Sequence, residues 1–471
     1  MSATRTFPQG FTWGTATASY QVEGAVGEDG RTPSIWDTMA HTPGGIVDGS
    51  NGDVSVDEYH RYPEDIALMT ELGVTGYRFS ISWPRNYPEP GTVNQAGIDH
   101  YKRLAEALLD AGITPLATLY HWDLPQYLED AGGWPNRGTA YRYAEYVSTT
   151  VSALGSHIST WGTLNEPWCS AFLGYADGEH APGRHDHPAA LAAAHHLNLA
   201  HGLGVQAIRA AQTDSRVSVS LNLHALRAAS DSAEDRAALA QCERVGNGIW
   251  LKPMLEGHYD PQLFEDTAHV TDWSFVQDGD LREISQPLDF LGLNYYSTST
   301  VRRIPGAVTP TWVEAHSTPW VGPFPGTETI EFLPPTGPLT AMGWNQEPEA
   351  LTELLVGLHR SYPELDLVVT ENGAAFDDEL SPNEDVHDPR RTAYYRAHIE
   401  AVGKAIDEGA PVKGYYAWSL LDNFEWAWGY TKRFGLFYVD YPTQARIWKD
   451  TGRWYAELAR TNTLPALAEQ V

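Results

Sequence analysis

The sequence predicts an α/β fold, a (β/α)8 TIM barrel, from three observations. Short apolar segments rich in β-branched and aromatic residues recur eight times, helix-like segments separate them, and polar loops with many aromatic residues follow them. Eight strands that alternate with helices are typical of this barrel, whose functional residues lie at the carboxyl ends of the strands. A doubly wound open sheet is the alternative, but no glycine-rich phosphate turn follows the first strand.

The individual elements are predicted from hydrophobic spacing and from the glycines that end helices. Ile66, Met69 and Leu72 lie at helical spacing, and Gly73 ends this helix before the next strand begins. A second helix, with leucines at 104, 108 and 109, ends in the same way at Gly112. The predicted strands are residues 11–17, 77–81, 114–119, 160–164, 217–223, 290–294, 367–370 and 414–418.

Residues 302–340 form an unusually long connection that is rich in proline, glycine and threonine. Connections of this length usually have a function, and this one follows the sixth predicted strand, so we expect it to border the mouth of the barrel. No linker, repeat or low-complexity tract interrupts the chain. We therefore expect a single domain, residues 1–471, with long loops after the strands.

The charge of the chain narrows the choice of partners. Lys and Arg number 31 against 61 Asp and Glu, which gives a formal net charge of −30 and a pI near 4.8. Such a surface repels phosphate backbones and anionic lipids, so neither nucleic acid nor a membrane is an expected partner. No apolar run reaches the roughly 20 residues of a spanning helix, and residues 1–9 lack the layout of a signal peptide. We expect a soluble cytoplasmic protein, whose oligomeric state the sequence leaves open.

The cysteines and histidines do not predict a metal site. Cys169 and Cys242 are too few for a disulfide framework or a four-cysteine zinc site, and we expect two buried thiols. The clustered histidines lack the His-x-x-x-His spacing that places two ligands on one helical face. We therefore expect neither a metal nor a cofactor. The clustered histidines are His180, His185, His187, His195 and His196.

The aromatic content favours a sugar-binding site. The chain has 17 Trp and 24 Tyr but only five Met, a ratio that an aliphatic core does not require. Indole rings offer a flat apolar face and an N–H donor, and a sugar ring presents a C–H face together with hydroxyl groups. The alternative is that many of these aromatic side chains simply pack in the core.

Two glutamates follow predicted strands on opposite sides of the barrel. Glu166 comes after the fourth strand and Glu371 after the seventh. Facing carboxylates are the catalytic groups of glycosidases, which retain the anomeric configuration when the carboxyl groups lie about 5 Å apart and invert it at about 8 Å. The sequence does not measure this distance. For either glutamate alone, helix capping or an ion pair with Arg78 is a structural alternative.

Four segments resemble the family 1 glycoside hydrolases, and among them the bacterial β-glucosidases. Their sequences are FTWGTATASYQVEG at residues 11–24, TLNEP at 163–167, VVTENG at 368–373 and WSLLDNFEW at 418–426. They follow one another in the family's order and span most of the chain. The resemblance implies a retaining reaction without a cofactor, with Glu371 as nucleophile and Glu166 as acid and then base. It also places Arg78 and Tyr296 beside the nucleophile, where a cation and a donor keep it ionised.

The resemblance further implies which residues bind the sugar. Amides, a carboxylate and an imidazole satisfy hydroxyl groups that donate and accept at once, and an indole supplies a floor. In this assignment Asn165 holds the 2-hydroxyl and Asn294 orients the acid/base region. The expected sugar-binding residues are Gln21, His121, Asn165, Asn294, Tyr296, Trp418, Glu425 and Trp426. On the aglycone side we expect Trp168, Leu173 and Trp344.

The expected activity is that of an exo-acting β-glucosidase on short oligosaccharides and on aryl or alkyl glucosides. The alternatives are a 6-phospho-β-glycosidase, a transglycosylase, and a sugar-binding protein without activity. Glu425 argues against a phosphorylated substrate, since phospho-specific relatives carry a small hydroxyl residue there and add a Lys and a Tyr, whereas this chain has Lys432 but Phe434. Preference among glucose, galactose and fucose stays open, as does the natural aglycone.

Overall fold

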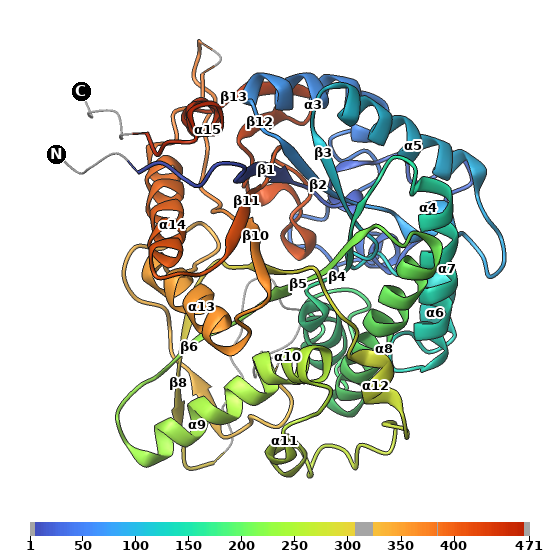
Figure 1. The fold of residues 1–471 in the computed structure, drawn as a ribbon, viewed down its shortest axis with the longest axis vertical. Coiled ribbons are helices and arrows are strands. Elements are labelled where there is room, and N and C mark those ends of the chain that lie inside the picture. The colour runs from blue at the N-terminus through green and yellow to red at the C-terminus, as the bar shows by residue number, and fades with distance from the viewer. Residues whose placement is uncertain (1–4, 307–323, 384, 466–471) are drawn as a thin grey trace.

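The computed structural model describes residues 5–306, 324–383 and 385–465, and a closed barrel of eight parallel strands forms its centre (Figure 1). The strands follow one another in chain order around the barrel, and the last pairs with the first, with Thr12 opposite Gly414. This confirms the predicted (β/α)8 barrel. The barrel strands are β1 (Thr12–Ala16), β2 (Gly76–Ser80), β3 (Thr114–Thr118), β4 (Thr160–Asn165), β5 (Arg216–Asn222), β7 (Phe290–Asn294), β10 (Asp366–Asn372) and β11 (Val412–Trp418).

All eight predicted strands are present, but some ends differ from the prediction. β10 continues through Glu371 to Asn372, so this glutamate lies within the strand and not after it. Asn165 likewise is the last residue of β4. Hydrophobicity does not reveal these ends, because the final residues of both strands are polar although they are buried.

The larger helices surround the barrel, as Figure 1 shows. The helix predicted from Ile66, Met69 and Leu72 ends as expected, and Gly73 after it has a φ of 77°, a left-handed conformation that glycine adopts without strain. The last helix, α15, contacts both α14 and α3, which closes the ring of larger helices. These helices are α3 (Glu58–Leu72), α5 (Gln95–Asp110), α7 (Gly138–Leu154), α8 (His187–Ala211), α13 (Pro348–Ser361), α14 (Pro389–Asp407) and α15 (Asp450–Thr461).

Long connections after the strands carry further short elements. After β1, β2 and β3 come α1 (Ser19–Val22), α2 (Ile35–Ala40), α4 (Trp83–Asn86) and α6 (Gln126–Asp130). A π-helix, η1 (Cys169–Asp177), follows β4. Between β5 and β7 lie β6 (Ala225–Ala228), α9 (Ala233–Glu243), η2 (Arg244–Gly248), α10 (Ile249–Leu251), η3 (Lys252–Glu256), α11 (Pro261–Asp266) and α12 (Asp280–Ile284). After β11 come η4 (Trp426–Thr431), β12 (Phe437–Asp440) and β13 (Ala445–Trp448).

The long connection predicted at residues 302–340 contains regular structure. It includes the end of β8 (Thr298–Arg303) and all of β9 (Ile330–Phe332), which pair antiparallel. β8 also pairs with β6, so the three strands form a small sheet outside the barrel. The prediction gave the position of this segment but missed its strands, because β9 has only three residues. Part of the segment, residues 307–323, lies outside the described residues.

A tyrosine fills the barrel where two strands carry glycine. A Cβ atom at Gly14 would lie 2.4 Å from Cδ1 of Tyr416, and one at Gly76 would lie 2.7 Å from its hydroxyl. Only glycine leaves space for this ring, which explains why both strands have a glycine there. Tyr416 therefore packs closely against β1 and β2 inside the barrel.

The two ends of the described chain meet beside the barrel. Leu464 N donates to the carbonyl of Arg5 at 2.8 Å, and Trp13 Nε1 donates to Asn462 Oδ1 at 2.9 Å. The largest cluster of buried apolar side chains extends from Phe7 to Leu464. Within the described ranges, no helix has the length and apolarity needed to cross a membrane.

Candidate active site

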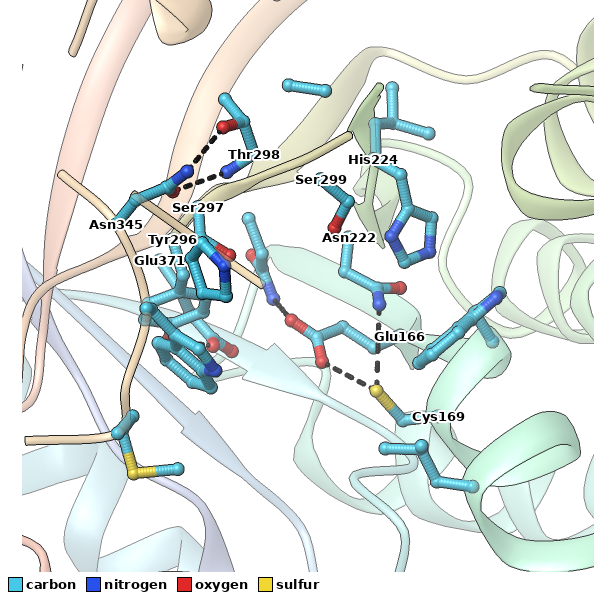
Figure 2. Close-up of a pocket in the computed structure, with 18 of the residues that line it drawn as sticks. Glu166, Cys169, Asn222, His224, Tyr296, Ser297, Thr298, Ser299, Asn345 and Glu371 are labelled. Carbon is cyan, nitrogen blue, oxygen red and sulfur yellow. Dashed lines mark hydrogen bonds between the residues drawn. The ribbon is translucent and has the colours of Figure 1, made fainter. Parts of the chain in front are cut away.

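A cavity of about 750 Å³ opens where the carboxyl ends of the barrel strands meet their loops. Figure 2 shows Glu166 and Glu371 in it, reached from β4 and β10. Three other predicted residues, Gln21, Arg78 and Asn165, do not line the cavity itself, and Arg78 and Asn165 form hydrogen bonds to residues that do. The predicted residues that line the cavity are His121, Glu166, Trp168, Leu173, Asn294, Tyr296, Trp344, Glu371, Trp418, Glu425 and Trp426.

Glu371 has two donors that favour its ionised form. Arg78 Nη1 donates to Oε1 at 2.6 Å, and the Tyr296 hydroxyl donates to Oε2 at 2.7 Å. The Arg78 side chain is fully buried, so water does not screen this ion pair. Burial raises the pKa of Glu371, while Arg78 and Tyr296 oppose the rise.

Glu166 has a different environment. Asn294 Nδ2 donates to its Oε1 at 2.7 Å, and the glutamate forms no ion pair with any described residue. Burial raises the pKa of Glu166 to about 8, and the nearby charge of Glu371 adds to the rise. Glu371 is therefore the stronger acid of this coupled pair.

Asn165 joins the surroundings of both carboxylates. Its Oδ1 accepts hydrogen bonds from Arg78 Nη2 at 2.6 Å and from Asn294 Nδ2 at 3.0 Å. Thr370 in turn donates to Asn294 Oδ1 at 2.6 Å. The network fixes the side chains around both glutamates.

Polar atoms that have no hydrogen-bond partner among the described residues lie in one part of the cavity and next to it. His121 Nδ1, Gln21 Oε1 and Glu425 Oε2 are buried, and none has a hydrogen-bond partner among the described residues. Buried polar atoms without partners are costly, so a ligand with hydroxyl groups gains free energy here. Trp418 and Trp426 supply flat apolar surface beside them.

The protonation of two of these groups follows from their surroundings. Burial and the Arg78 charge hold the pKa of His121 well below its usual value, so this ring is neutral. Its Nε2 lies 3.0 Å from Asn165 Nδ2 and accepts from it, which leaves the proton on the free Nδ1. Burial and the charges of Glu371 and Glu166 raise the pKa of Glu425 to about 8.

Comparison with known proteins agrees with this geometry. Residues 3–464 match the family model described as "Glycosyl hydrolase family 1". The chain belongs to this family. It is 51% identical over 462 residues to the bifunctional β-D-glucosidase/β-D-fucosidase of Bifidobacterium breve, covering 96% of this chain and 98% of that protein. It is 43% identical over 460 residues to β-glucosidase A of Thermotoga maritima, covering 97% and 98%.

Solved structures of the family share the fold. The psychrophilic β-glucosidase of Micrococcus antarcticus is 45% identical, with a TM-score of 0.93 over 97% of this chain and 98% of that chain. The Thermotoga maritima β-glucosidase in complex with deoxynojirimycin is 43% identical, with a TM-score of 0.90 over 97% and 99%. The barrel and its long loops thus agree with solved structures of family members.

Another part of this family 1 cavity is lined by apolar side chains. Trp168, Leu173 and Trp344, which were expected on the aglycone side, are among them. The sequence analysis missed Asn222 and His224, which also line it. These two residues lie at the end of β5 and just after it, so the rule that located the other site residues would also have found them.

Lys432 and Phe434, at the positions where phospho-specific relatives bind the phosphate, have other contacts in this structure. Lys432 Nζ donates to the carbonyl of Ala341 at 2.8 Å and lies 4.5 Å from the Trp428 ring centre. Phe434 packs against Trp344, with ring centres 6.1 Å apart. None of the described residues that line the cavity is a lysine or an arginine.

Of the clustered histidines, His180 lines the cavity, whereas His195 and His196 are buried in α8 and form hydrogen bonds outside it. His195 lies 2.8 Å from Asp280 and 3.0 Å from the Tyr259 hydroxyl, and His196 contacts the carbonyl of Trp134. Within the described ranges, no three His, Cys, Asp or Glu side chains are placed to hold a metal ion.

Proposed function

We propose that the chain is a retaining, exo-acting β-glucosidase that releases terminal β-D-glucosyl residues from short oligosaccharides and from aryl or alkyl glucosides. The unequal environments of the two buried glutamates carry this proposal. Glu371 has a cation and a phenol that keep it ionised, whereas Glu166 has a pKa raised to about 8 and holds a proton. A nucleophile and an acid need these opposite states.

In the first half of the proposed reaction, Glu371 attacks the anomeric carbon. Glu166 gives its proton to the glycosidic oxygen as the bond to the aglycone breaks, and a covalent glucosyl ester forms on Glu371. In the second half the ester has removed the charge of Glu371, so the pKa of Glu166 falls. Glu166 then takes a proton from water, which displaces glucose from Glu371 and restores both groups.

We propose that the polar end of the cavity binds the glucosyl residue. The free polar atoms of Gln21, His121 and Glu425 satisfy its hydroxyl groups, and Trp418 and Trp426 pack against its ring. Asn165 Nδ2 donates one hydrogen to His121 Nε2, and its second hydrogen is left for the 2-hydroxyl. Asn294 orients Glu166, while Trp168, Leu173 and Trp344 contact the aglycone.

Azide rescue tests the two catalytic assignments. Glu166→Ala still has a nucleophile, so with a dinitrophenyl glucoside, which needs little acid help, it should form the ester and yield β-glucosyl azide. Glu371→Ala has no nucleophile and should yield the α-azide. The wild-type protein should release β-glucose first, as proton NMR of the early product will show. Identical azide products from the two variants would reject the assignment.

Two other activities remain alternatives. A transglycosylase forms the same ester and differs only in the acceptor, so product analysis with added alcohol separates it from a hydrolase. A 6-phospho-β-glycosidase would need a cation for the phosphate, and Lys432 is engaged elsewhere. The Bifidobacterium breve relative is named for a second activity on β-D-fucosides, which makes p-nitrophenyl β-fucoside a further substrate to test.

We also propose that residues 1–471 form one domain that acts in the cytoplasm on oligosaccharides from cellulose and other polysaccharides, with no nucleic acid or membrane partner. The connected apolar core supports one domain, and the net charge of −30 supports the absence of anionic partners. Cell fractionation and gel filtration with a nucleic acid probe test these points.

A further inference from the structure

The thiol of Cys169 contacts the carboxyl group of Glu166. Its Sγ donates to Glu166 Oε2 at 3.2 Å, and Asn222 Nδ2 donates to the sulfur at 3.6 Å, as Figure 2 shows. Cys169 is buried and lies on the cavity wall at the start of η1. Because the sulfur accepts from Asn222, its own hydrogen points to the glutamate.

The two oxygens of Glu166 have donors of unequal strength. Oε1 accepts a short hydrogen bond, 2.7 Å, from the Asn294 amide, whereas Oε2 accepts one from the Cys169 thiol at 3.2 Å. The hydroxyl oxygen of a carboxylic acid accepts hydrogen bonds poorly, so the oxygen facing the stronger donor acts as the carbonyl. The acidic proton of Glu166 therefore lies on Oε2, beside Cys169.

We propose that Cys169 is a positioning residue that keeps Oε2 as the proton-carrying oxygen of Glu166, with a donor too weak to strip that oxygen of its proton. This inference rests on the proposed function, in which Glu166 gives this proton to the glycosidic oxygen and regains one from water. A thiol is a weak donor, so it orients the carboxyl group while stabilising the carboxylate only slightly. A serine hydroxyl there would stabilise the carboxylate more strongly.

Several neighbouring groups influence the pKa of Glu166. Glu371 from β10 raises its pKa, and Arg78 from β2 and the thiol of Cys169 lower it. Tyr296 and Glu425 also interact with its charge. Burial and the charge of Glu166 hold the pKa of Cys169 well above its usual value, so the sulfur keeps its hydrogen.

The pH dependence of kcat/KM tests this role, since its basic limb reports the loss of the Glu166 proton in the free enzyme. Cys169→Ser should move the basic limb to lower pH by about 0.5 to 1 unit, because a stronger donor favours the carboxylate. Cys169→Ala should move it to higher pH, and the acidic limb should stay in place in both. Cys242→Ser and Cys242→Ala are matched controls, since Cys242 is buried outside the cavity. If the basic limbs of the wild type, Cys169→Ser and Cys169→Ala coincide, or if Cys169→Ser shifts to higher pH and Cys169→Ala to lower pH, the positioning role of Cys169 is wrong.

Infrared spectroscopy gives a readout that leaves Cys169 unchanged. The chain has two cysteines, so Cys242→Ala leaves one S–H stretching band, that of Cys169. The frequency of this band should fall as Glu166 ionises. In the double variant Cys242→Ala/Glu166→Gln the frequency should not depend on pH. A band that ignores pH would overturn the inference.

These outcomes are distinguishable from failure of the proposed function. Intact azide rescue of Glu166→Ala, together with an unmoved basic limb in the Cys169 variants, would overturn only the role of Cys169. Absence of azide rescue would overturn the assignment of Glu166 itself, and the positioning role with it.

Discussion

The partners of single residues give two chemically identical side chains different acidities. Glu166 and Glu371 are both buried, and burial raises the pKa of each. The difference comes from Arg78 and Tyr296, which contact only one of them. The different acidities therefore depend on two donors, one from β2 and one from the loop after β7. A change in either donor should appear in one limb of the pH profile.

Tyr296→Phe should shift the acidic limb of kcat/KM to higher pH by about one unit. The variant removes a hydrogen bond to the Glu371 carboxylate, and such bonds contribute about 1.5–3 kcal/mol, whereas one pKa unit corresponds to about 1.4 kcal/mol. Without this hydrogen bond the ionised form of Glu371 is less favoured, so the pKa of Glu371 rises. Tyr295→Phe is the control, since that hydroxyl donates to the carbonyl of Glu347 and not to the site. An acidic limb unchanged in Tyr296→Phe would contradict the assigned contact.

Discrimination against a phosphorylated substrate should grow with pH. The pKa of Glu425 is raised to about 8, so near neutral pH much of this group is protonated and repels a phosphate only weakly. Discrimination there comes from the lack of a cation for the phosphate. Above pH 8 the carboxylate adds its repulsion. We expect p-nitrophenyl β-glucoside to exceed its 6-phosphate in kcat/KM at least about a hundredfold, roughly 2.7 kcal/mol, with the ratio rising from pH 7 to 9. A ratio near one, or one that falls with pH, would show that Glu425 is misassigned.

At the scale of elements, the sequence predicted every barrel strand but not the structures outside the barrel. Regular hydrophobic spacing identifies strands such as β3, whose buried residues are apolar or small. β9 has three residues and gains its identity from pairing with β8, which no local pattern reveals. The predicted site residues lie at the carboxyl ends of strands for the same topological reason. The contact of Cys169 with Glu166 was not predicted, because it depends on the turn between β4 and η1, in which Cys169 N donates to the carbonyl of Glu166 at 2.9 Å.

Residues from η1 and from the segment before β9, Leu173 and Phe324, line the same apolar part of the cavity. Leu173 from η1 is half-buried, and Trp168 packs against Phe324, with ring centres 5.3 Å apart. Truncating Trp168 and Leu173 to alanine should change inhibition by free glucose and the preference among aryl glucosides. Leu354→Ala is the control for lost packing, since that leucine is partly buried in α13 away from the cavity. If both proteins lose only thermal stability, the residues serve packing alone.

At the scale of the whole molecule, buried ion pairs connect the carboxyl-terminal segment to the barrel loops. Lys449, between β13 and α15, donates to Asp378 at 2.5 Å and to Asp422 at 2.6 Å. These aspartates belong to the loops after β10 and β11, and the lysine is fully buried. One side chain therefore holds together three segments near the site.

Lys449→Met should lower the free energy of unfolding by about 1.5–3 kcal/mol, because Asp378 and Asp422 each lose one buried charged partner but keep Arg391 and Arg433. Lys413→Met is the control, since Lys413 is half-exposed and pairs with Asp366 at 3.4 Å. That change should cost about 0–1 kcal/mol. Urea unfolding followed by tryptophan fluorescence measures both. Equal effects of the two substitutions would contradict the role of Lys449.

The pairing of β1 with β11 also has a consequence for synthesis of the chain. β1 ends at Ala16 but its neighbour begins at Val412, so at roughly 5–20 residues per second the first strand waits about 20 to 80 s for this partner. Until then the nascent sheet keeps two open edges, and open edges pair readily with other chains. A ribosome that stalls before Val412 therefore releases an aggregation-prone open sheet instead of a shortened barrel.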